Sequence, residues 1–386
     1  MTRGPEVTIV QRRLTGYRVQ FFERLRALLA AEGVRLRLLH GDPTPLEATK
    51  RDGGHLPWAE HVRTRYLAGD RLCWQSFGAQ TRSSDLVVVT QENKLLYNFV
   101  AMTVARPPRL AFWGHGANLQ AENRDSWKER VKRWTTCKVD WWFAYTELSA
   151  GLVRQQGFPP ERITVLDNAI DTNQLAGWCA SIDEQRKAEL CAKWGLRGRH
   201  VGIFLGSLYA DKRIDFLLDA AEEIRRRVPD FELLIVGAGP LQGMVDAFCA
   251  NRPWARSLGH RKGIEKAEAL AVAHVMLNPG LVGLGILDAF VSRVPLLTVD
   301  CGKHGPEIAY LEHGRNGWMV PDGMRPFVEA ACLLLTQQEL RAQLQSGCAM
   351  AAGRYTVEGM ARRFADGIGQ CLGAPPLAER GLAWRT

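Results

Sequence analysis

The sequence lacks the features that assign a chain to several common classes. Its nine cysteines are scattered among 386 residues, without a Cys-x-x-Cys pair or the spacing of zinc ligands. This pattern argues against a disulfide framework and predicts free thiols in a reducing compartment. No apolar run approaches the roughly 20 residues that span a bilayer, and the N-terminus carries Arg3 and Glu6 without a long apolar core. We therefore expect a cytoplasmic protein without a signal peptide or a transmembrane helix.

Two common nucleotide-binding motifs are also missing. The sequence contains no GxxxxGK[ST] loop, which argues against a P-loop NTPase. Gly237-Ala238-Gly239-Pro240 follows a predicted strand, but the next glycine is Gly243, so the spacing is G-x-G-x-x-x-G and not G-x-G-x-x-G. A nicotinamide enzyme is therefore weakly supported, and a structural strand-to-helix turn is the favoured interpretation. No recognised nucleic-acid-binding module occurs, so nucleic acid is not an expected partner.

The composition is that of an ordinary globular protein with a basic surface. A chain of 386 residues is long for a single core and suits two domains. Hydrophobic residues make up 46% of the chain and charged residues 24%, which is typical of soluble domains. The formal net charge of +9 indicates an anionic partner, without choosing among a nucleotide, a nucleic acid and an acidic membrane surface.

Short apolar runs alternate with helical patterns along the whole chain, which predicts an α/β protein with parallel sheets covered on both faces. Gly41–Pro57 is rich in glycine, proline and aspartate and is predicted to be a long loop, and the polar stretch Asp167–Asp171 suits a linker between two sheets in series. Ligands of such sheets bind at the carboxyl ends of the strands. The predicted strands cover residues 6–10, 34–40, 85–90, 109–113, 141–146, 163–166, 201–205, 232–236, 275–278, 295–299 and 318–320.

The stretch Asn278–Phe290 carries the strongest candidate site. Gly280, Gly283 and Gly285 lie in or beside a turn between a buried strand and a helix that contains Asp288. A strand, a glycine turn and a helix in this order aim backbone N–H groups at an anion. The alternative is a turn that packs tightly against its own sheet, and the stretch alone does not decide between the two.

A second glycine turn offers two cations. Gly206-Ser207-Leu208 follows the strand at 201–205, and Lys212 and Arg213 open the next helix. A lysine and an arginine at the end of a strand, beside a glycine turn, can neutralise a diphosphate. The alternative is a solvated helix start with ordinary surface charge.

Two strand ends carry further candidates. His115 lies between two glycines at the end of a first-half strand, where the imidazole can meet a ligand, although a lone histidine is more often structural. Glu307, after the strand at 295–299, can bind sugar hydroxyls or cap the helix that follows. His304 and Glu307 are three residues apart, but no third ligand is apparent, so no metal site is expected.

A basic segment with tryptophans lies in the first half of the chain. Arg124–Lys138 has six basic and two acidic residues, interleaved with Trp127, Val131 and Trp134. Such a helix can lie on an anionic membrane surface. The alternative, a solvated helix with a buried tryptophan edge, is equally supported.

Taken together, these positions resemble the GT-B glycosyltransferases, specifically the retaining glycosyltransferase family 4. The resemblance is strongest from about Asn168 to Asp322. Asn168-Ala169-Ile170-Asp171 is similar to the Asn-Gly-Ile/Val-Asp junction of the family, Gly206-Ser207-Leu208 with Lys212 to its Gly-Arg-Leu-x-x-x-Lys, Ile235–Pro240 to its Val-Gly-x-Gly-Pro, and Pro306-Glu307-Ile308 and Asn316-Gly317 to its Glu-Ile and Asn-Gly segments. His115 stands where the family has a histidine that faces the donor sugar.

The sequence departs from the family at two places. Ser207 replaces the arginine after the glycine, which leaves Lys212 and Arg213 to hold the diphosphate. Of the two family glutamates eight residues apart, the second matches Asp288 and the first matches Gly280. A branch of the family has Pro-Gly-x-Val-Gly-Leu at this turn, so we interpret the change as a variant donor site.

The resemblance implies two Rossmann-like domains that face a cleft: an acceptor domain at 1–170, a donor domain at 171–355, and a C-terminal helix and tail at 356–386 that pack back on the first domain. It implies transfer of a sugar from a nucleotide-diphosphate sugar to an acceptor, without a metal or another cofactor. The basic segment with tryptophans suggests a saccharide or lipid-linked acceptor at the inner face of the cytoplasmic membrane, as in cell-surface polysaccharide synthesis. Lys212 would stabilise the leaving diphosphate, Asp288 would bind the ribose and His115 the donor sugar. Further donor contacts are expected from Gly206, Ser207, Arg213, Gly237, Gly280, Val282, Gly283, Leu284 and Glu307.

Two other functions stay open at this point. A nucleotide-sugar epimerase of the same two-domain shape would need no acceptor, so that product analysis on the donor alone separates it from a transferase. A non-catalytic protein that lost its chemistry with the first glutamate would bind a nucleotide sugar without turnover.

Overall fold

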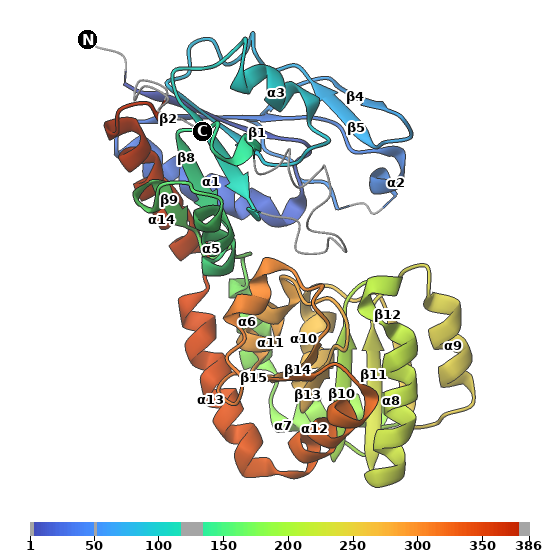
Figure 1. Ribbon diagram of the computed structural model, residues 1–386. Coiled ribbons are helices and arrows are strands. Elements are labelled where there is room, and N and C mark those ends of the chain that lie inside the picture. The colour runs from blue at the N-terminus through green and yellow to red at the C-terminus, as the bar shows by residue number, and fades with distance from the viewer. Residues whose placement is uncertain (1–3, 50–51, 117–133, 378–386) are drawn as a thin grey trace. The chain divides into compact units, whose positions relative to one another are not determined.

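The computed structural model describes residues 4–49, 52–116 and 134–377, and these divide into two compact units (Figure 1). Unit 1 comprises Met1–Asp171 and Val357–Thr386, and unit 2 comprises Thr172–Thr356. Each unit has a parallel sheet with helices packed on it, so the predicted α/β class is confirmed.

The sheet of unit 1 has seven parallel strands in the order β3-β2-β1-β6-β7-β8-β9. Its central strands are continuous apolar runs such as Leu-Val-Val-Val-Thr in β6, as expected where both faces of a parallel sheet are covered. The bounds are β1 Glu6–Gln11, β2 Arg35–His40, β3 Glu60–His61, β6 Leu86–Thr90, β7 Leu110–Gly114, β8 Trp141–Ala144 and β9 Ile163–Val165, with an antiparallel hairpin of β4 Thr64–Leu67 and β5 Leu72–Gln75.

The C-terminal helix is part of unit 1. Helix α14 (Val357–Gly373) packs against α1 (Val19–Ala31), whose buried face includes Phe21. Phe364 of α14 stacks on Phe143 of β8, with 4.2 Å between the ring centroids, and its ring lies 5.6 Å from that of Phe21. Burial of these rings ties the end of the chain to its beginning. The remaining helical segments of unit 1 are η1 Gly16–Arg18, α2 Pro45–Ala48, α3 Leu96–Met102, α5 Glu147–Gln155 and η2 Pro160–Arg162.

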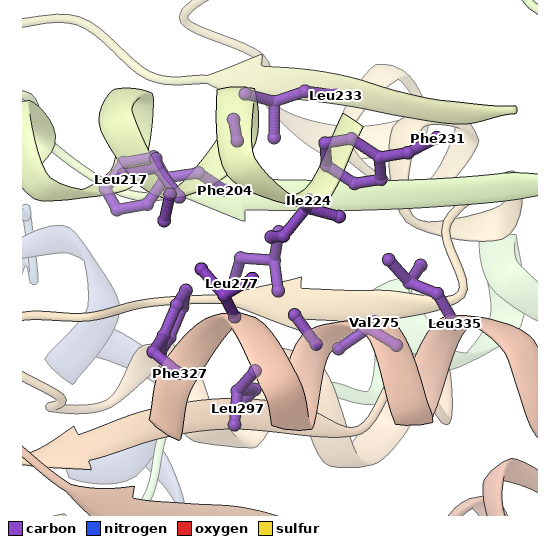
Figure 2. Packing of buried hydrophobic residues seen from close by; sticks show 14 of the residues in the cluster. Phe204, Leu217, Ile224, Phe231, Leu233, Val275, Leu277, Leu297, Phe327 and Leu335 are labelled. Carbon is purple, nitrogen blue, oxygen red and sulfur yellow. The ribbon is translucent and has the colours of Figure 1, made fainter. Parts of the chain in front are cut away.

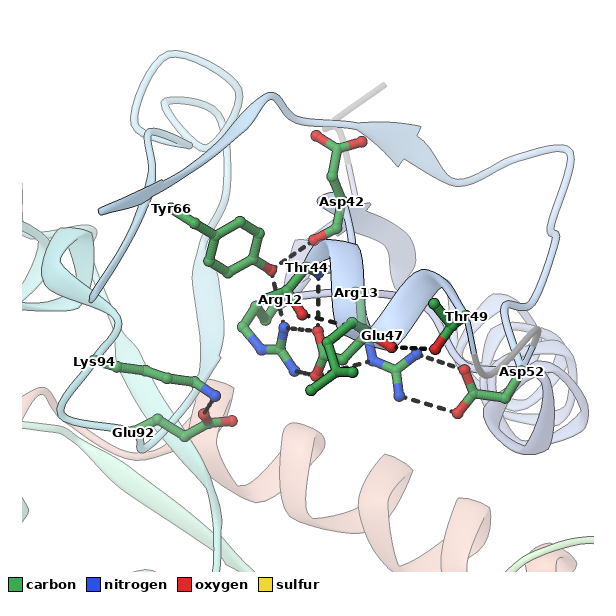
Figure 3. A network of polar contacts seen from close by, with 11 residues as sticks. Arg12, Arg13, Asp42, Thr44, Glu47, Thr49, Asp52, Tyr66, Glu92 and Lys94 are labelled. Atoms are coloured by element: carbon green, nitrogen blue, oxygen red, sulfur yellow. Dashed lines mark hydrogen bonds and ion pairs between the residues drawn. The ribbon is translucent and has the colours of Figure 1, made fainter. Parts of the chain in front are cut away.

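The predicted long loop at 41–57 contains a short helix held by ion pairs (Figure 3). Thr44 and Glu47 form a capping box at the start of α2. Arg12, directly after β1, donates to Glu47 over 2.6 Å, and Arg13 pairs with Asp52 over 2.7 Å. The loop prediction was therefore incomplete, because the partners that stabilise α2 lie about 35 residues away in the sequence.

Acid should weaken this network in a defined pH range. The Arg12 guanidinium, as the main cause, lowers the pKa of Glu47 from 4.5 to about 2. A carboxylate with a depressed folded-state pKa contributes stability above pH 4.5, and this contribution is lost as the pH falls towards 2. Urea denaturation between pH 6 and 3 should show a steeper loss of stability in wild type than in Glu47→Gln. Parallel curves would contradict the role given to this ion pair.

Unit 2 has a six-stranded parallel sheet in the order β12-β11-β10-β13-β14-β15. Helices α8 and α12 pack together, and Leu217, Ile224 and Phe327 meet the strand residues Phe204 and Leu277 in the core (Figure 2). The strands are β10 His200–Leu205, β11 Phe231–Val236, β12 Ala255–Gly259, β13 Val275–Leu277, β14 Leu296–Asp300 and β15 Gly317–Pro321; the helical segments are α6 Asn173–Ser181, α7 Glu184–Trp194, η3 Ala210–Lys212, α8 Ile214–Arg227, α9 Gln242–Ala250, α10 Gly263–Ala271, α11 Gly285–Ser292, η4 Pro306–Tyr310, α12 Met324–Thr336 and α13 Gln338–Arg354.

Two elements of unit 2 were not predicted. Strand β12 reads Ala-Arg-Ser-Leu-Gly and lies at the edge of the sheet, so it lacks the apolar run that identifies central strands. Helix α6 buries only Leu175 strongly, and its sequence shows little amphipathic pattern. Pairing with β11 and packing against α10 stabilise these elements, and neither contact is visible in a local sequence window.

The order of the strands places a binding site in unit 2. Strand β10 lies between β11 and β13, so the chain proceeds to one side of β10 with β11 and to the other side with β13. Such a topological switch point leaves a crevice beyond the carboxyl ends of the two strands, where ligands of open α/β sheets bind. Gly206 and Asn278 are the first residues after β10 and β13.

Candidate functional site

Lys212 lies against the glycine turn after β13. Its Nζ atom donates a hydrogen bond to the carbonyl oxygen of Leu281, and Asn278 Nδ2 donates to the same oxygen over 3.3 Å. Burial lowers the pKa of Lys212 to about 8, opposed by the negative charge of Asp211. The side chain is therefore still largely protonated at neutral pH, and the structure brings the cation and the turn together at the switch point.

Gly280 is the contact point between this turn and η3. A Cβ atom on Gly280 would lie 2.4 Å from the carbonyl oxygen of Asp211 and 2.6 Å from the Cα atom of Lys212. The backbone N–H of Leu281 donates to that Asp211 oxygen over 2.8 Å. Glycine is required here because the backbone of η3 occupies the space of a side chain. The close approach of η3 to the turn, which sets the position of Lys212, therefore depends on glycine at residue 280.

His304 fixes the backbone of the turn. Its Nδ1 atom accepts a hydrogen bond from the N–H of Val282 over 3.1 Å, and its Nε2 atom donates to the carbonyl oxygen of Val299 over 2.7 Å. Burial lowers the pKa of His304, which agrees with the neutral ring that this pair of bonds requires. The N–H of Val282 is therefore already bonded within the protein. It cannot make the contact with the nucleotide sugar that was predicted for Val282.

Loss of His304 should destabilise unit 2. The variant His304→Ala leaves the N–H of the buried Val282 without its acceptor, which should cost about 1–3 kcal/mol of unfolding free energy. His313 offers a matched control, because its Nδ1 atom accepts from the N–H of Met319 over 3.2 Å at an exposed position where water can replace it. Urea denaturation of both alanine variants tests this difference. Equal losses would mean that the buried acceptor has no special effect.

Three N–H groups at the start of α11 remain available. Within the described residues, the N–H groups of Gly283, Leu284 and Gly285 have no assigned acceptor. Leu284 is the N-cap and Gly285 the first residue of α11, an eight-residue helix whose dipole favours an anion, and Gly283 directly precedes them. Glu307 lies at the same turn, since its Oε2 atom is 4.0 Å from the position of a Cβ atom on Gly283.

Arg213 and Gly237 have structural contacts in this part of the molecule. Arg213 adopts a left-handed conformation, pairs with Asp322 over 2.6 Å and lies over the ring of Phe216. A Cβ atom on Gly237 would meet the carbonyl oxygen of Gly206 at 1.8 Å, so Gly237 allows two strand ends to approach closely. Both predicted cations contact the turn: Lys212 donates to the Leu281 carbonyl, and Arg213 donates to the Pro279 carbonyl over 3.5 Å while it pairs with the Asp322 carboxylate. Ser207 is exposed beside Gly206.

Asp288 points to a different set of neighbours. Its Oδ1 atom pairs with Lys266 of α10 over 2.9 Å, and its side chain is only 12% exposed. The charges of Asp288 and Lys266 both act on Cys179, whose pKa burial raises to about 11. The contact of Asp288 with the ribose stays a prediction. In that case the Asp288 carboxylate would bind both the ribose hydroxyls and the Lys266 ammonium.

Two predicted features belong to unit 1. His115 follows β7 in unit 1, where it is exposed and makes an edge-to-face contact with Tyr145 at 4.5 Å. Its assignment to the donor sugar stays a prediction. Most of the basic segment at 124–138 lies outside the described residues; Trp134, which is described, is 53% exposed and has the Lys138 ammonium over its ring.

The arrangement can bind a diphosphate. Backbone N–H groups at a helix start and a lysine beside them supply fixed positive charge on one side of a crevice. Among the described residues, no group of three or more histidine, cysteine and acidic side chains could hold a metal ion. Sequence reasoning missed the positioning roles of His304 and Asn278, although both follow predicted strands. It gave no signal for Lys266, whose partner is identified only by the packing of α10 on α11.

Comparison of the whole chain with solved structures identifies the architecture. The structure of Anabaena HepE in complex with UDP-glucose superposes with a TM-score of 0.68 and 16% sequence identity, over 94% of this chain and 99% of that one. The fold is GT-B. The two parallel-sheet units described above are the two Rossmann-like domains of this fold.

Sequence comparison adds information on unit 2. Residues 199–337 match the family model described as "Glycosyl transferases group 1". An alpha-D-kanosaminyltransferase of Streptomyces kanamyceticus is 27% identical over 45% of this chain and 46% of its own length. A GDP-mannose-dependent alpha-(1-6)-phosphatidylinositol monomannoside mannosyltransferase of Mycolicibacterium smegmatis is 30% identical over 42% of this chain and 44% of its own length. The matched regions thus span slightly less than half the length of these curated relatives.

Proposed function

We propose that this GT-B protein is a retaining glycosyltransferase that moves a sugar from a nucleotide-diphosphate sugar to a saccharide or lipid-linked acceptor. The observation that carries the proposal is the Lys212 ammonium on the Leu281 carbonyl, next to the available N–H groups of Gly283 and Leu284. These groups lie at the switch point of the unit that matches the group 1 family. A diphosphate is the ligand that this combination of charge and N–H donors suits best.

The chemistry follows from where negative charge develops. As the bond between the sugar C1 atom and the diphosphate oxygen breaks, the leaving diphosphate gains charge, which Lys212 and the N–H groups stabilise. An oxygen of the departing phosphate takes the proton of the acceptor hydroxyl, and that hydroxyl oxygen forms the new bond to C1 on the same face. The Lys212 ammonium supplies the positive charge, so we expect the reaction to proceed without a metal, and EDTA to leave its rate unchanged.

The relatives favour transfer over the two alternatives. Both curated relatives are named as transferases, and HepE was solved with UDP-glucose. The names support a nucleotide-sugar donor and an acceptor, whereas an epimerase would need no acceptor. The packing role of Gly280, where the backbone of η3 occupies the space of a side chain, supports our interpretation of the turn as a variant donor site.

A lipid-linked acceptor is the finer part of the proposal. One relative is named for a phosphatidylinositol monomannoside, and the basic segment Arg124–Lys138 suits an anionic membrane surface. No helix in the described ranges is long and apolar enough to cross a membrane. Flotation with liposomes tests peripheral binding at the inner face: we expect binding to anionic vesicles at low salt. Equal recovery with neutral vesicles would contradict it.

A donor screen tests the function itself. Thermal-shift measurements with UDP-, GDP-, dTDP- and ADP-sugars should single out one donor, since a ligand at 100 times its Kd stabilises the folded state by about 2.7 kcal/mol. The selected donor is then incubated with saccharide and lipid-linked acceptors, and the products are analysed. A glycosylated acceptor with retained anomeric configuration is expected. An altered sugar without acceptor would indicate an epimerase, and binding without any product would indicate a non-catalytic protein.

A further inference from the structure

Unit 2 contains a groove at the opposite edge of its sheet from the glycine turn. It has a volume of about 830 Å³ and lies between α7 and α13. Its lining includes Gly198, His274 and Val294, which lie just before the first residues of β10, β13 and β14. Because β10 has six residues, the amino and carboxyl edges of the sheet are about 20 Å apart. The volume is in the range of small-molecule sites. The groove is thus separate from the glycine turn and large enough for a ligand.

The groove carries positive charge that the described residues do not neutralise. Four cations line it, and of these Lys187 pairs with Glu184 over 2.6 Å and Arg197 approaches Asp230 at 3.4 Å. Arg293 and Arg341, the other two, have no carboxylate partner in the described part of the chain. Two uncompensated guanidinium groups in one concave site favour an anionic occupant.

Arg341 is held in place but keeps donors available. Its Nη1 atom donates to the carbonyl oxygens of Leu334 and Leu335 at the end of α12, over 3.0 Å and 2.6 Å. No acceptor among the described residues is assigned to its Nε and Nη2 groups. Burial lowers the pKa of Arg341, which reports the cost of keeping this cation half-buried without a counterion. A bound anion would offset that cost.

Arg293 occupies a position where glycine is the usual residue. It is the C-cap of α11 in a left-handed conformation, with φ of 56°, and its side chain is exposed at the groove. A residue with a Cβ atom is disfavoured there relative to glycine. The arginine therefore keeps a charge at the groove despite the backbone that it must adopt.

His274 adds a neutral donor to the floor of the groove. Its Nδ1 atom accepts from the N–H of Val201 over 3.1 Å, so the ring proton lies on Nε2. Burial, together with the positive charges of Arg341 and Lys187, lowers its pKa to about 4. The first turn of α13, which lines the groove with Gln338, has no side-chain cap on its N–H groups. Both features add hydrogen-bond donors and no acceptor for a cation.

We propose that this groove binds a phosphate-bearing small molecule between Arg293 and Arg341. The guanidinium fork matches phosphate oxygens, and the groove offers further donors from His274 and the start of α13. The site is distinct from the diphosphate site of the proposed function and does not depend on it. A second phosphate site in the donor unit gives the protein a place at which a phosphorylated metabolite can bind besides its substrate.

Isothermal titration calorimetry with pyrophosphate tests the proposal on the full chain. Wild type should bind two equivalents, one at Lys212 and one in the groove. The variant Arg293→Met/Lys187→Met, which leaves the α12 contacts of Arg341 intact, should weaken the groove equivalent roughly 10- to 100-fold. Arg341→Met should do the same if its melting curve remains cooperative. The control Arg226→Met/Arg325→Met removes two exposed arginines elsewhere and should bind as wild type does.

The outcomes separate this proposal from the transferase assignment. Retention of one equivalent in Lys212→Met, and its loss on adding the groove substitutions, supports the groove site. If the groove variants lose one equivalent of pyrophosphate but Lys212→Met binds as much pyrophosphate as wild type, the groove site is supported and the diphosphate site at Lys212 is contradicted. Unaltered binding in the groove variants, or no binding at all in Lys212→Met, overturns the proposal.

Discussion

Replacing Lys212 with methionine should lower kcat by about 10²–10³ and at the same time raise the stability of the protein. The loss of rate is that of one preorganised group that stabilises developing negative charge. The ammonium contacts the Leu281 carbonyl at the start of the turn, so its removal leaves the N–H groups of α11 alone to hold the leaving diphosphate. Methionine keeps the length of the side chain and its apolar stem.

The gain in stability follows from the sign of the pKa shift. Burial lowers the pKa of Lys212 from 10.5 in the unfolded chain to about 8 in the fold. Between pH 8 and 10.5 the unfolded chain binds more protons, so folding stability rises with pH there. At pH 7 the buried charge therefore costs up to about 3 kcal/mol, and the methionine variant avoids this cost.

The matched control is Lys193→Met, an exposed lysine on α7. Its kcat should be that of wild type, and its unfolding free energy should stay within about 0.5 kcal/mol. Urea denaturation and initial rates at pH 7 give both readouts. A Lys212→Met variant that turns over like wild type, or one that is less stable, would contradict the role given to this side chain.

Gly280→Ala should damage the site more than its small size suggests. The added Cβ atom would lie 2.4 Å from the Asp211 carbonyl oxygen, so η3 and the turn must move apart. Such overpacking costs about 1–3 kcal/mol, and a displacement of Lys212 by about 1 Å can lower kcat/KM by roughly 10²-fold. Gly280→Glu, which places a larger side chain at the same position, should lose more stability and activity than Gly280→Ala.

Gly243→Ala serves as the control for this prediction. Gly243 lies in α9, and no atom comes within 4 Å of the position of its added Cβ atom. Alanine should there be neutral or stabilise by about 0.4–1 kcal/mol, because it restricts the unfolded chain. Melting temperatures and kcat/KM values of both variants decide the point. An active, stable Gly280→Glu variant would show that the packing of η3 on the turn does not require glycine at residue 280.

Much of the fold could be predicted because parallel strands are continuous apolar runs. The runs at 201–205 and 232–236 match β10 and β11 closely. Elements whose stability comes from distant contacts escaped prediction. The hairpin of β4 and β5 and the short helix α2 depend on side chains such as Arg12 and Tyr66, which bond each other across 54 residues.

The site could be predicted only to the level of strand ends and glycines. These features pointed to Lys212 and to the turn after β13, which the structure brings together. They could not indicate that the N–H of Val282 is engaged by His304, or that Gly280 makes room for the backbone of Asp211. Both facts depend on separations of a few ångströms between segments that are 20 to 70 residues apart in the sequence.

A crystal structure of the protein with the nucleoside diphosphate selected by the donor screen tests the central claim most directly. We expect the distal phosphate to accept hydrogen bonds from the N–H groups of Gly283 and Leu284, with the Nζ atom of Lys212 within about 3.2 Å of a phosphate oxygen. A diphosphate bound elsewhere, with the Lys212 ammonium still directed only at the Leu281 carbonyl, would contradict the account.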